Sequence, residues 1–161
     1  MSDLKEILIA MIWSLSDSKR VSMPRLVKAM YLYDWTSVLN FGAQSPALPW
    51  SCGMCGPTSS SINETIRRNA DSFSVCEASN HVGGTKTVVV CVAHDTYSEL
   101  SEAEQRAIRH VAGAIRGMPW DDLSLLIAST MPIVISTYGE PLDLVRAAQL
   151  RRAANDHSEA R

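Results

Sequence analysis

The sequence contains no uninterrupted apolar stretch of the roughly 18 residues that a membrane-spanning helix needs. It also lacks the pattern of a secretory signal peptide, because Asp3, Lys5 and Glu6 precede the first apolar run and no small-residue cleavage site follows that run. These two absences predict a cytoplasmic protein with no membrane partner. In that compartment the four cysteines of the chain are expected to be reduced.

Positive charge is not in excess either. The chain has 15 Lys and Arg residues against 17 Asp and Glu residues, a net charge of -2 and a pI of about 6.1. A free-standing nucleic-acid-binding protein normally carries a strongly basic surface, so this balance argues against nucleic acid as a partner. With 46% hydrophobic and 20% charged residues, the composition favours a normal core and a charge-poor surface that a partner covers in part.

The familiar catalytic motifs are missing. The serines at positions 59–61 do not form a Gly-x-Ser-x-Gly nucleophile elbow, and serine at a helix start is more often a cap than a nucleophile. Gly83-Gly84 is not followed by a helix that opens with Lys-Ser or Lys-Thr, so it predicts a turn and not a phosphate-binding loop. The sequence therefore predicts no catalytic residue.

Periodicity and capping residues predict a mainly α-helical domain with a small β-hairpin (α+β), built from five to six helices. A single domain is expected over residues 1–154, and residues 155–161 are expected to form a polar C-terminal tail. The expected helices span residues 4–15, 22–41, 57–69, 101–117, 119–130 and 141–154. The expected hairpin joins residues 73–77 and 85–93. Residues 131–136 are expected to be a buried strand or an extended segment.

Asp34 falls inside the apolar stripe of the helix expected over residues 22–41. Its helical neighbours on that face are Val27, Met30, Val38 and Phe41. An ionised carboxylate loses hydration there and must regain it from donors. One interpretation rotates the helix so that Asp34 lies at the rim, and a second gives it backbone N–H donors at the next helix start, Gly56 to Thr58. A catalytic role is the third interpretation.

Cysteine spacing leaves three interpretations open. The cysteines Cys52, Cys55, Cys76 and Cys91 have the spacing Cys-x2-Cys-x20-Cys-x14-Cys. A zinc site normally shows a second close pair, but hairpin pairing could bring the last two together, with His81 or His94 as substitutes. The apolar surroundings of Cys76 and Cys91 favour buried structural thiols and no cofactor. A redox or nucleophilic role of Cys52 and Cys55 is the remaining alternative.

Several segments occur in an order that resembles a known family. They are RLVKAMYLYDW with Lys28, Tyr31, Leu32, Asp34 and Trp35, then Cys55-Gly56-Pro57-Thr58, then Leu100-Ser101-Glu102, then WDDLSLLIAST. Together they resemble the Panacea family of SocA-like antitoxin domains, over about residues 4–130. The chain departs from the family where Thr130-Met131-Pro132-Ile133 replaces a Glu-Pro-x-Trp-like segment.

This resemblance implies a mostly helical bacterial or phage protein that neutralises a cognate toxin by direct contact and has no established catalytic residues. The structural motif that it implies consists of Lys28, Tyr31, Asp34, Trp35, Gly56 and Pro57. The candidate partner-binding residues are Trp50, Arg67 and Arg68, and Tyr31 and Trp35 are further anchors or core residues. Three alternatives stay open: a proteolytic adaptor for a toxin, a zinc- or thiol-dependent enzyme using Cys52 and Cys55, and a subunit of a phage-defence complex. The sequence leaves the oligomeric state open.

Overall fold

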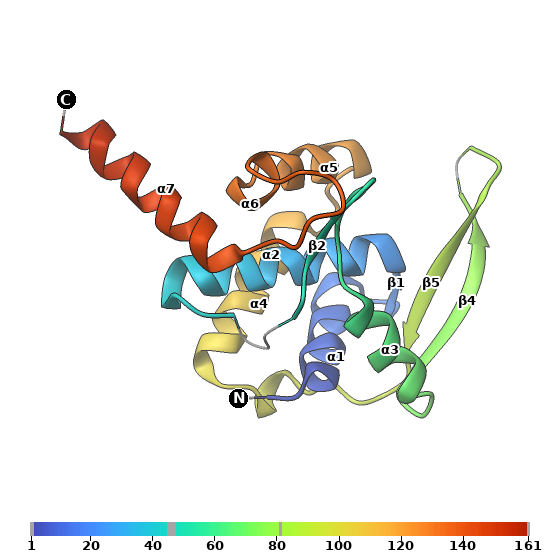
Figure 1. The fold of residues 1–161 in the computed structure, drawn as a ribbon. Helices are drawn as coiled ribbons and strands as arrows, with labels where there is room; N and C mark the ends of the chain where they lie inside the picture. The colour runs from blue at the N-terminus through green and yellow to red at the C-terminus, as the bar shows by residue number, and fades with distance from the viewer. Residues whose placement is uncertain (1, 45–47, 81, 161) are drawn as a thin grey trace.

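Three helices cross near the middle of the molecule (Figure 1). Helix α1 (Leu4–Leu15) is apolar on nearly all sides, and its residues 7–12 are all buried. It packs against α2 (Met23–Phe41) and α4 (Glu102–Ile115), which also pack against each other. The structure is a computed structural model that describes residues 2–44, 48–80 and 82–160.

Local sequence signals set the ends of the two long helices. Helix α2 follows Ser22, has a proline in its first turn and ends at Gly42, whose φ of 75° lies in the left-handed region that glycine adopts freely. Helix α4 begins with a capping box, in which Ser101 Oγ accepts the Glu104 N–H and the Glu104 carboxylate accepts the Ser101 N–H.

Two small antiparallel sheets lie beside this helical core. One has the strand order β1-β5-β4, and its strands are β1 (Arg20–Ser22), β5 (Thr85–Cys91) and β4 (Phe73–Ser79). The other pairs β2 (Ser51–Gly53) with β3 (Gly56–Thr58). The remaining elements are α3 (Ser60–Arg68), the 3-10 helix η1 (Tyr97–Glu99), α5 (Trp120–Ala128), α6 (Met131–Val134) and α7 (Leu144–Glu159).

The expected fold class, mainly α with a small β-hairpin, is confirmed. The described ranges contain seven α-helices, more than the five or six expected. The additional helix is α6, because residues 131–134 form one helical turn with Pro132 buried and not the strand or extended segment expected there. The predicted hairpin is present as β4 and β5, and β1 adds a third strand that the sequence analysis missed.

Two helix starts were predicted wrongly, both at a proline. Pro57 lies in strand β3, and α3 begins at Ser60. Pro141 forms an isolated β-bridge with Ser51, and α7 begins after Asp143, whose carboxylate accepts the N–H of Arg146. Proline suits a strand edge as well as a first helical turn, so it does not distinguish the two.

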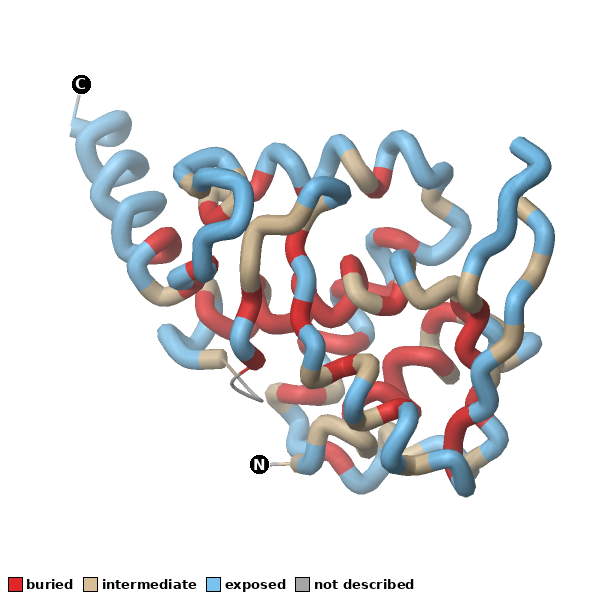
Figure 2. Tube along the Cα trace, turned by 45° about the vertical axis from the view of Figure 1, so that its right-hand side comes forward, coloured by how far each residue is buried: buried red, intermediate tan, exposed pale blue. Residues whose placement is uncertain are grey.

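The last helix leaves the body of the molecule. Helix α7 buries Leu144, Ala147 and Ala148, whereas residues 149–160 are all exposed (Figure 2). The polar residues from 155 on, expected as a C-terminal tail, continue this helix to Glu159. Within the described ranges, every helix is too short or too polar to cross a bilayer.

Candidate functional site

The β2–β3 hairpin is held on both of its sides. Its strands pair with the register Ser51↔Thr58 and Gly53↔Gly56. The outer side of β2 bonds to residues 139–142, since Cys52 N–H donates to Glu140 O at 2.9 Å, Gly139 N–H to Cys52 O at 2.7 Å and Leu142 N–H to Trp50 O at 2.8 Å. The inner side rests on α2, whose residues 28–34 provide three separate attachments described below.

Lys28 provides the first attachment. Its side chain is 4% exposed, its Nζ donates to Cys55 O at 2.7 Å, and Nζ lies 4.9 Å from the ring centroid of Trp120. Burial lowers the pKa of Lys28, although the nearby Cys55 thiol acts in the opposite direction. Gly56 adopts φ 109° beside this amine, and a Cβ at Gly56 would lie 3.5 Å from Nζ. The hairpin turn therefore closes over a buried cation.

Tyr31 provides the second attachment, one turn further along α2. Its hydroxyl and Thr130 Oγ1 lie 2.7 Å apart, and Thr130 Oγ1 also donates to Ile127 O at 2.7 Å. The Tyr31 ring packs edge-on against Trp50 with centroids 5.5 Å apart. Burial raises the pKa of Tyr31 well above its usual value. Tyr31 thus joins α2 to the end of α5 and to the hairpin.

Asp34 provides the third attachment. It is 0% exposed, and its Oδ2 accepts the indole N–H of Trp50 at 2.7 Å and the amide N–H of Gln44 at 3.1 Å. Within the described ranges, Oδ1 has no hydrogen-bond partner. Burial raises the pKa of Asp34 to about 7, against the opposing effect of these two hydrogen bonds.

These contacts exclude two of the three interpretations of Asp34. The rim position is wrong because the carboxyl is fully buried. The backbone donors expected at residues 56–58 are also wrong, because the donors are the side chains of Trp50 and Gln44. The aromatic donor could have been anticipated from the sequence, since an indole N–H is one of the few donors able to enter an apolar seam.

The residues of the proposed family motif lie close to one another. Lys28, Tyr31 and Asp34 are spaced by one turn along α2, and each attaches to the segment that contains the hairpin or to the end of α5. Trp35 and Pro57 are buried. The contacts of this group are consistent with a structural role.

The candidate anchors separate into buried and exposed residues. Trp50 is 2% exposed, so it belongs to the core and is not available at the surface, contrary to its assignment as a partner-binding residue. Tyr31 and Trp35 are buried as well. Arg67 and Arg68 lie exposed in the last turn of α3, where cations suit the negative end of the helix dipole.

The structure does not assemble the four cysteines into one site. Cys76 pairs across the sheet with Val88, and Cys91 pairs with Phe73, so the two are three residues out of register. All four cysteines are free thiols, and burial raises the pKa of Cys91. Among the described residues, no group of three or more His, Cys, Asp and Glu side chains is placed to hold a metal ion. His81 lies outside the described residues.

Exposed apolar side chains lie on the hairpin turn, on α5 and α6 and just after α6, and the sequence analysis missed them. We call this group the α5–α6 surface; it consists of Met54, Trp120, Leu125, Leu126, Val134, Ile135 and Tyr138. Met54 is 87% and Leu125 is 71% exposed, and α5 contacts both β3 and α6. The segment LSLLI in α5 is the signal that could have revealed it. A helix that buries only Leu123 and Ile127 leaves the other leucines outside.

Comparison of the chain with models of protein families, with curated proteins and with solved structures finds no match. What the site can do is therefore argued from its residues and their contacts.

Proposed function

We propose that the chain is a non-enzymatic protein-binding domain that acts as an antitoxin, neutralising a partner toxin by direct contact through the α5–α6 surface. The observation that carries the proposal is the exposure of seven large apolar side chains on α5, on α6, on the turn after β2 and just after α6, with α5 in contact with both α6 and β3. Contiguous exposed apolar area is unfavourable in a free monomer and is typical of protein interaction sites. Trp, Tyr and Met are also among the residues enriched at interfaces.

Buried side chains of α2 hold the α5–α6 surface in place. Trp120 packs over the Lys28 amine, and the turn that bears Met54 is closed by the hydrogen bond from Lys28 to Cys55 O. Tyr31 fixes the end of α5 through Thr130. A surface held in place before binding loses less conformational entropy when the partner docks. The motif that resembles the Panacea family thus supports the surface, and it does not have to contact the toxin itself.

Charge around the surface indicates the chemistry of the partner. Asp121 and Asp122 are exposed in the first turn of α5, and Glu140 is exposed beside the hairpin. An apolar patch with an acidic rim favours a partner whose own apolar patch is bordered by Lys or Arg side chains. We therefore propose a toxin with a basic rim around its apolar contact surface.

The test is co-expression with the protein encoded by the adjacent gene, scored for rescue of growth and for a complex that co-purifies. The double variant Leu125→Asp/Ile135→Asp should lose rescue and weaken the complex at least thirty-fold, because truncated interface anchors cost about 2 kcal/mol or more. The matched control is Val82→Asp, a change of a large exposed apolar residue on the β4–β5 turn. It should leave both readouts unchanged.

Thermal unfolding of each variant checks that the fold persists. Full rescue and an unchanged complex in the Leu125→Asp/Ile135→Asp variant would refute the assignment of this surface. A neighbouring protein that is not toxic, or that forms no complex with the unaltered chain, would refute the antitoxin function.

A further inference from the structure

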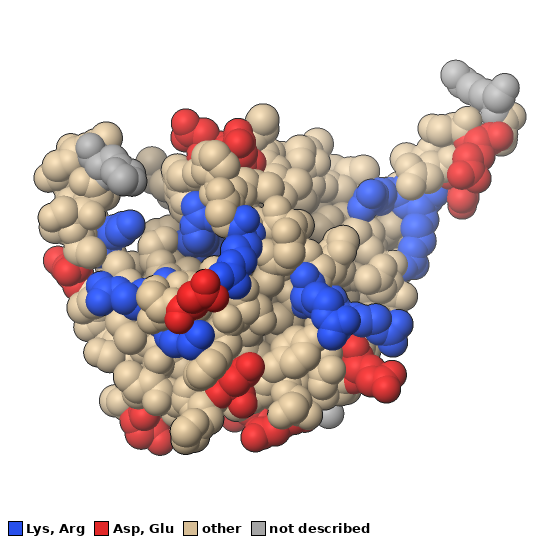
Figure 3. Space-filling model, turned by 180° about the vertical axis from the view of Figure 1, so that it is seen from behind, with Lys and Arg blue, Asp and Glu red and all other residues tan. Residues whose placement is uncertain are grey.

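A second surface feature lies outside the β2–β3 hairpin, at the junction of five elements. It is a pocket of about 410 Å³ between the end of α1, β1, the start of α2, β5 and the end of α4. Small-molecule sites in proteins have volumes of this order. Four of the side chains that line it are basic, namely Arg20, Arg25, Lys86 and Arg116. Figure 3 shows several groups of Lys and Arg side chains across the rear face of the molecule, with Asp and Glu side chains among them.

This convergence does not follow from the overall charge, because the chain carries a net charge of -2. It follows from topology, since each of the four cations comes from a different element. Arg20 begins β1, Arg25 lies in the first turn of α2, Lys86 lies in β5 and Arg116 follows α4. Like charges brought together repel one another, so such an arrangement needs a compensating group.

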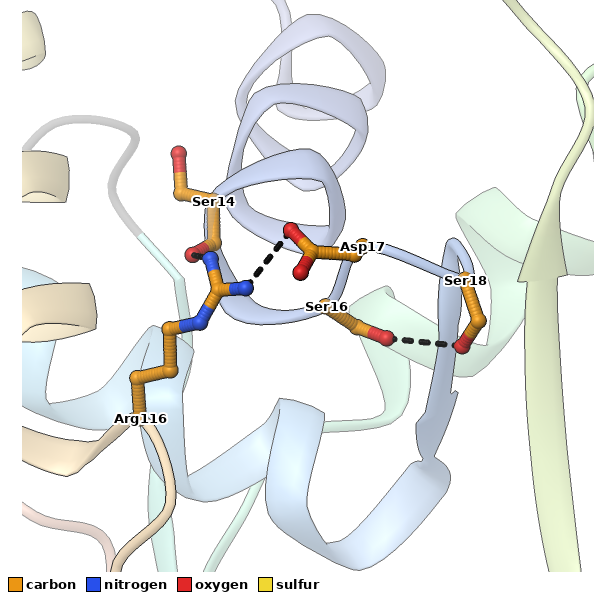
Figure 4. Close-up of polar contacts among 5 residues, drawn as sticks. All are labelled: Ser14, Ser16, Asp17, Ser18 and Arg116. Carbon is orange, nitrogen blue, oxygen red and sulfur yellow. Dashed lines mark hydrogen bonds and ion pairs between the residues drawn. The ribbon is translucent and has the colours of Figure 1, made fainter.

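Only one of the four cations has a carboxylate partner within the described ranges. Arg116 Nη2 lies 2.6 Å from Asp17 Oδ1, and its Nη1 donates to Ser14 O at 3.2 Å (Figure 4). Arg20, Arg25 and Lys86 form no ion pair in the described part of the chain. Arg25 Nη2 donates to Met118 O at 2.9 Å, which satisfies one N–H but does not neutralise the charge.

Helix dipoles offset part of this charge. The C-terminal ends of α1 and α4 face the pocket, and each supplies about half a negative charge. The N-terminal end of α2 supplies the opposite sign, and Arg25 lies in that first turn, where a cation is unfavourable. Asp17 and the two negative helix ends therefore neutralise only part of the positive charge of the four cations.

The rest of the pocket offers apolar area and a hydroxyl. The apolar lining residues are Leu15, Val21, Ile115 and Met118. Ser16 also lines the pocket, and its Oγ lies 2.9 Å from Ser18 Oγ, as Figure 4 shows. Guanidinium groups bind phosphate through two parallel N–H donors, so three arginines around a small concave space match a ligand with more than one phosphate.

We propose that this pocket binds a small molecule that carries two or more phosphate groups. The concave shape favours a small ligand over a nucleic-acid strand, which would need a groove basic along its length. The neighbouring groove beyond Arg116 is lined by Arg109 and also by Asp95, so the basic character is weaker there. The proposal does not depend on the toxin-binding surface, because no residue is shared between the two sites.

Isothermal titration with inorganic pyrophosphate and with ATP tests the proposal at low ionic strength, where charge interactions are least screened. The variant Arg20→Ala/Lys86→Ala should weaken binding of both probes at least ten-fold. The matched control is Arg67→Ala/Arg68→Ala, which removes two exposed charges on α3 and should change the affinity less than two-fold. Asp17→Asn should strengthen binding, because it releases Arg116 from its carboxylate partner.

Thermal unfolding confirms that each variant folds, and a single-stranded oligonucleotide serves as a further probe. Tighter binding of ATP than of pyrophosphate would indicate that the apolar lining contacts the part of the ligand beyond its phosphates. Equal binding of the two would indicate that the phosphates alone are recognised, and both outcomes support the site. The proposal is overturned if neither probe gives a binding heat. It is also overturned if the two double variants lose the same amount of affinity. Far tighter binding of the oligonucleotide at this pocket than of either probe would overturn it as well.

Discussion

Replacing Asp34 by asparagine should remove one component of the pH dependence of stability. The carboxyl is fully buried, and burial raises its pKa from 3.8 to about 7. Asparagine keeps the shape and keeps a carbonyl oxygen that can accept the indole N–H of Trp50, but it cannot ionise. The comparison therefore isolates the cost of placing a negative charge in the seam between α2 and the hairpin.

The sign follows from proton counting. Between pH 3.8 and about 7 the folded state holds a proton on Asp34 that the unfolded state has released. The stability that the protonated carboxyl contributes is therefore fully present below pH 3.8, and it is lost as the pH rises through about 7. About two pH units separate pH 5 from this raised pKa, and each unit corresponds to about 1.4 kcal/mol. Raising the pH from about 5 to about 8 should therefore cost the unaltered protein roughly 2–3 kcal/mol at this site.

Urea unfolding of both proteins at about pH 5 and about pH 8 measures this difference. The two should be similar at the lower pH, and Asp34→Asn should be the more stable at the higher pH by roughly 2–3 kcal/mol. Asp17→Asn is the matched control, because Asp17 is exposed and Arg116 lowers its pKa, so Asp17 is ionised in both states across this window and its removal should leave the pH dependence unchanged. Identical pH profiles for the unaltered protein and Asp34→Asn would refute the reasoning.

Two further changes test the other buried polar contacts. Burial alone would raise the pKa of Glu104, but hydrogen bonds from Ser101 and Ser2 outweigh burial and lower this pKa. Glu104→Gln should therefore lower the free energy of unfolding by about 1 kcal/mol at neutral pH and leave it unchanged well below pH 4.5, as measured by urea unfolding. A loss of stability that persists in acid would contradict this. Gly56→Ala should lower stability by about 1–3 kcal/mol in thermal unfolding, because φ 109° is strained for alanine. An unchanged midpoint would show that the turn relaxes freely.

Much of the helical framework is accessible from the sequence because its signals are local. The apolar spacing in residues 4–15, the Ser22 and Gly42 ends of α2 and the capping box of α4 each lie within a few residues of the feature that they specify. The strands β2 and β3 escaped prediction because each has three residues, and because β2 also bonds to residues 139–142, far along the chain. Periodicity cannot be read in so short a segment.

In the candidate site, too, local features could be predicted from the sequence and distant contacts could not. The wheel position of Asp34 predicted an unusual carboxyl, because its surroundings are set by its own helix. Its partners Trp50 and Gln44 are 16 and 10 residues away, and no spacing rule identifies them. The basic pocket was equally hidden, since Arg20, Lys86 and Arg116 are scattered in the sequence and meet only when five elements fold together.

The attachment of the hairpin to residues 139–142 has a consequence for shortened versions of the chain. Strand β2 uses the Cys52 N–H, the Cys52 carbonyl and the Trp50 carbonyl to bond to that segment. A truncation that ends before residue 139 would leave these groups at a bare sheet edge next to Met54, and a bare edge can recruit strands from other molecules. A fragment designed to retain the hairpin as a soluble unit should therefore extend at least to Leu142.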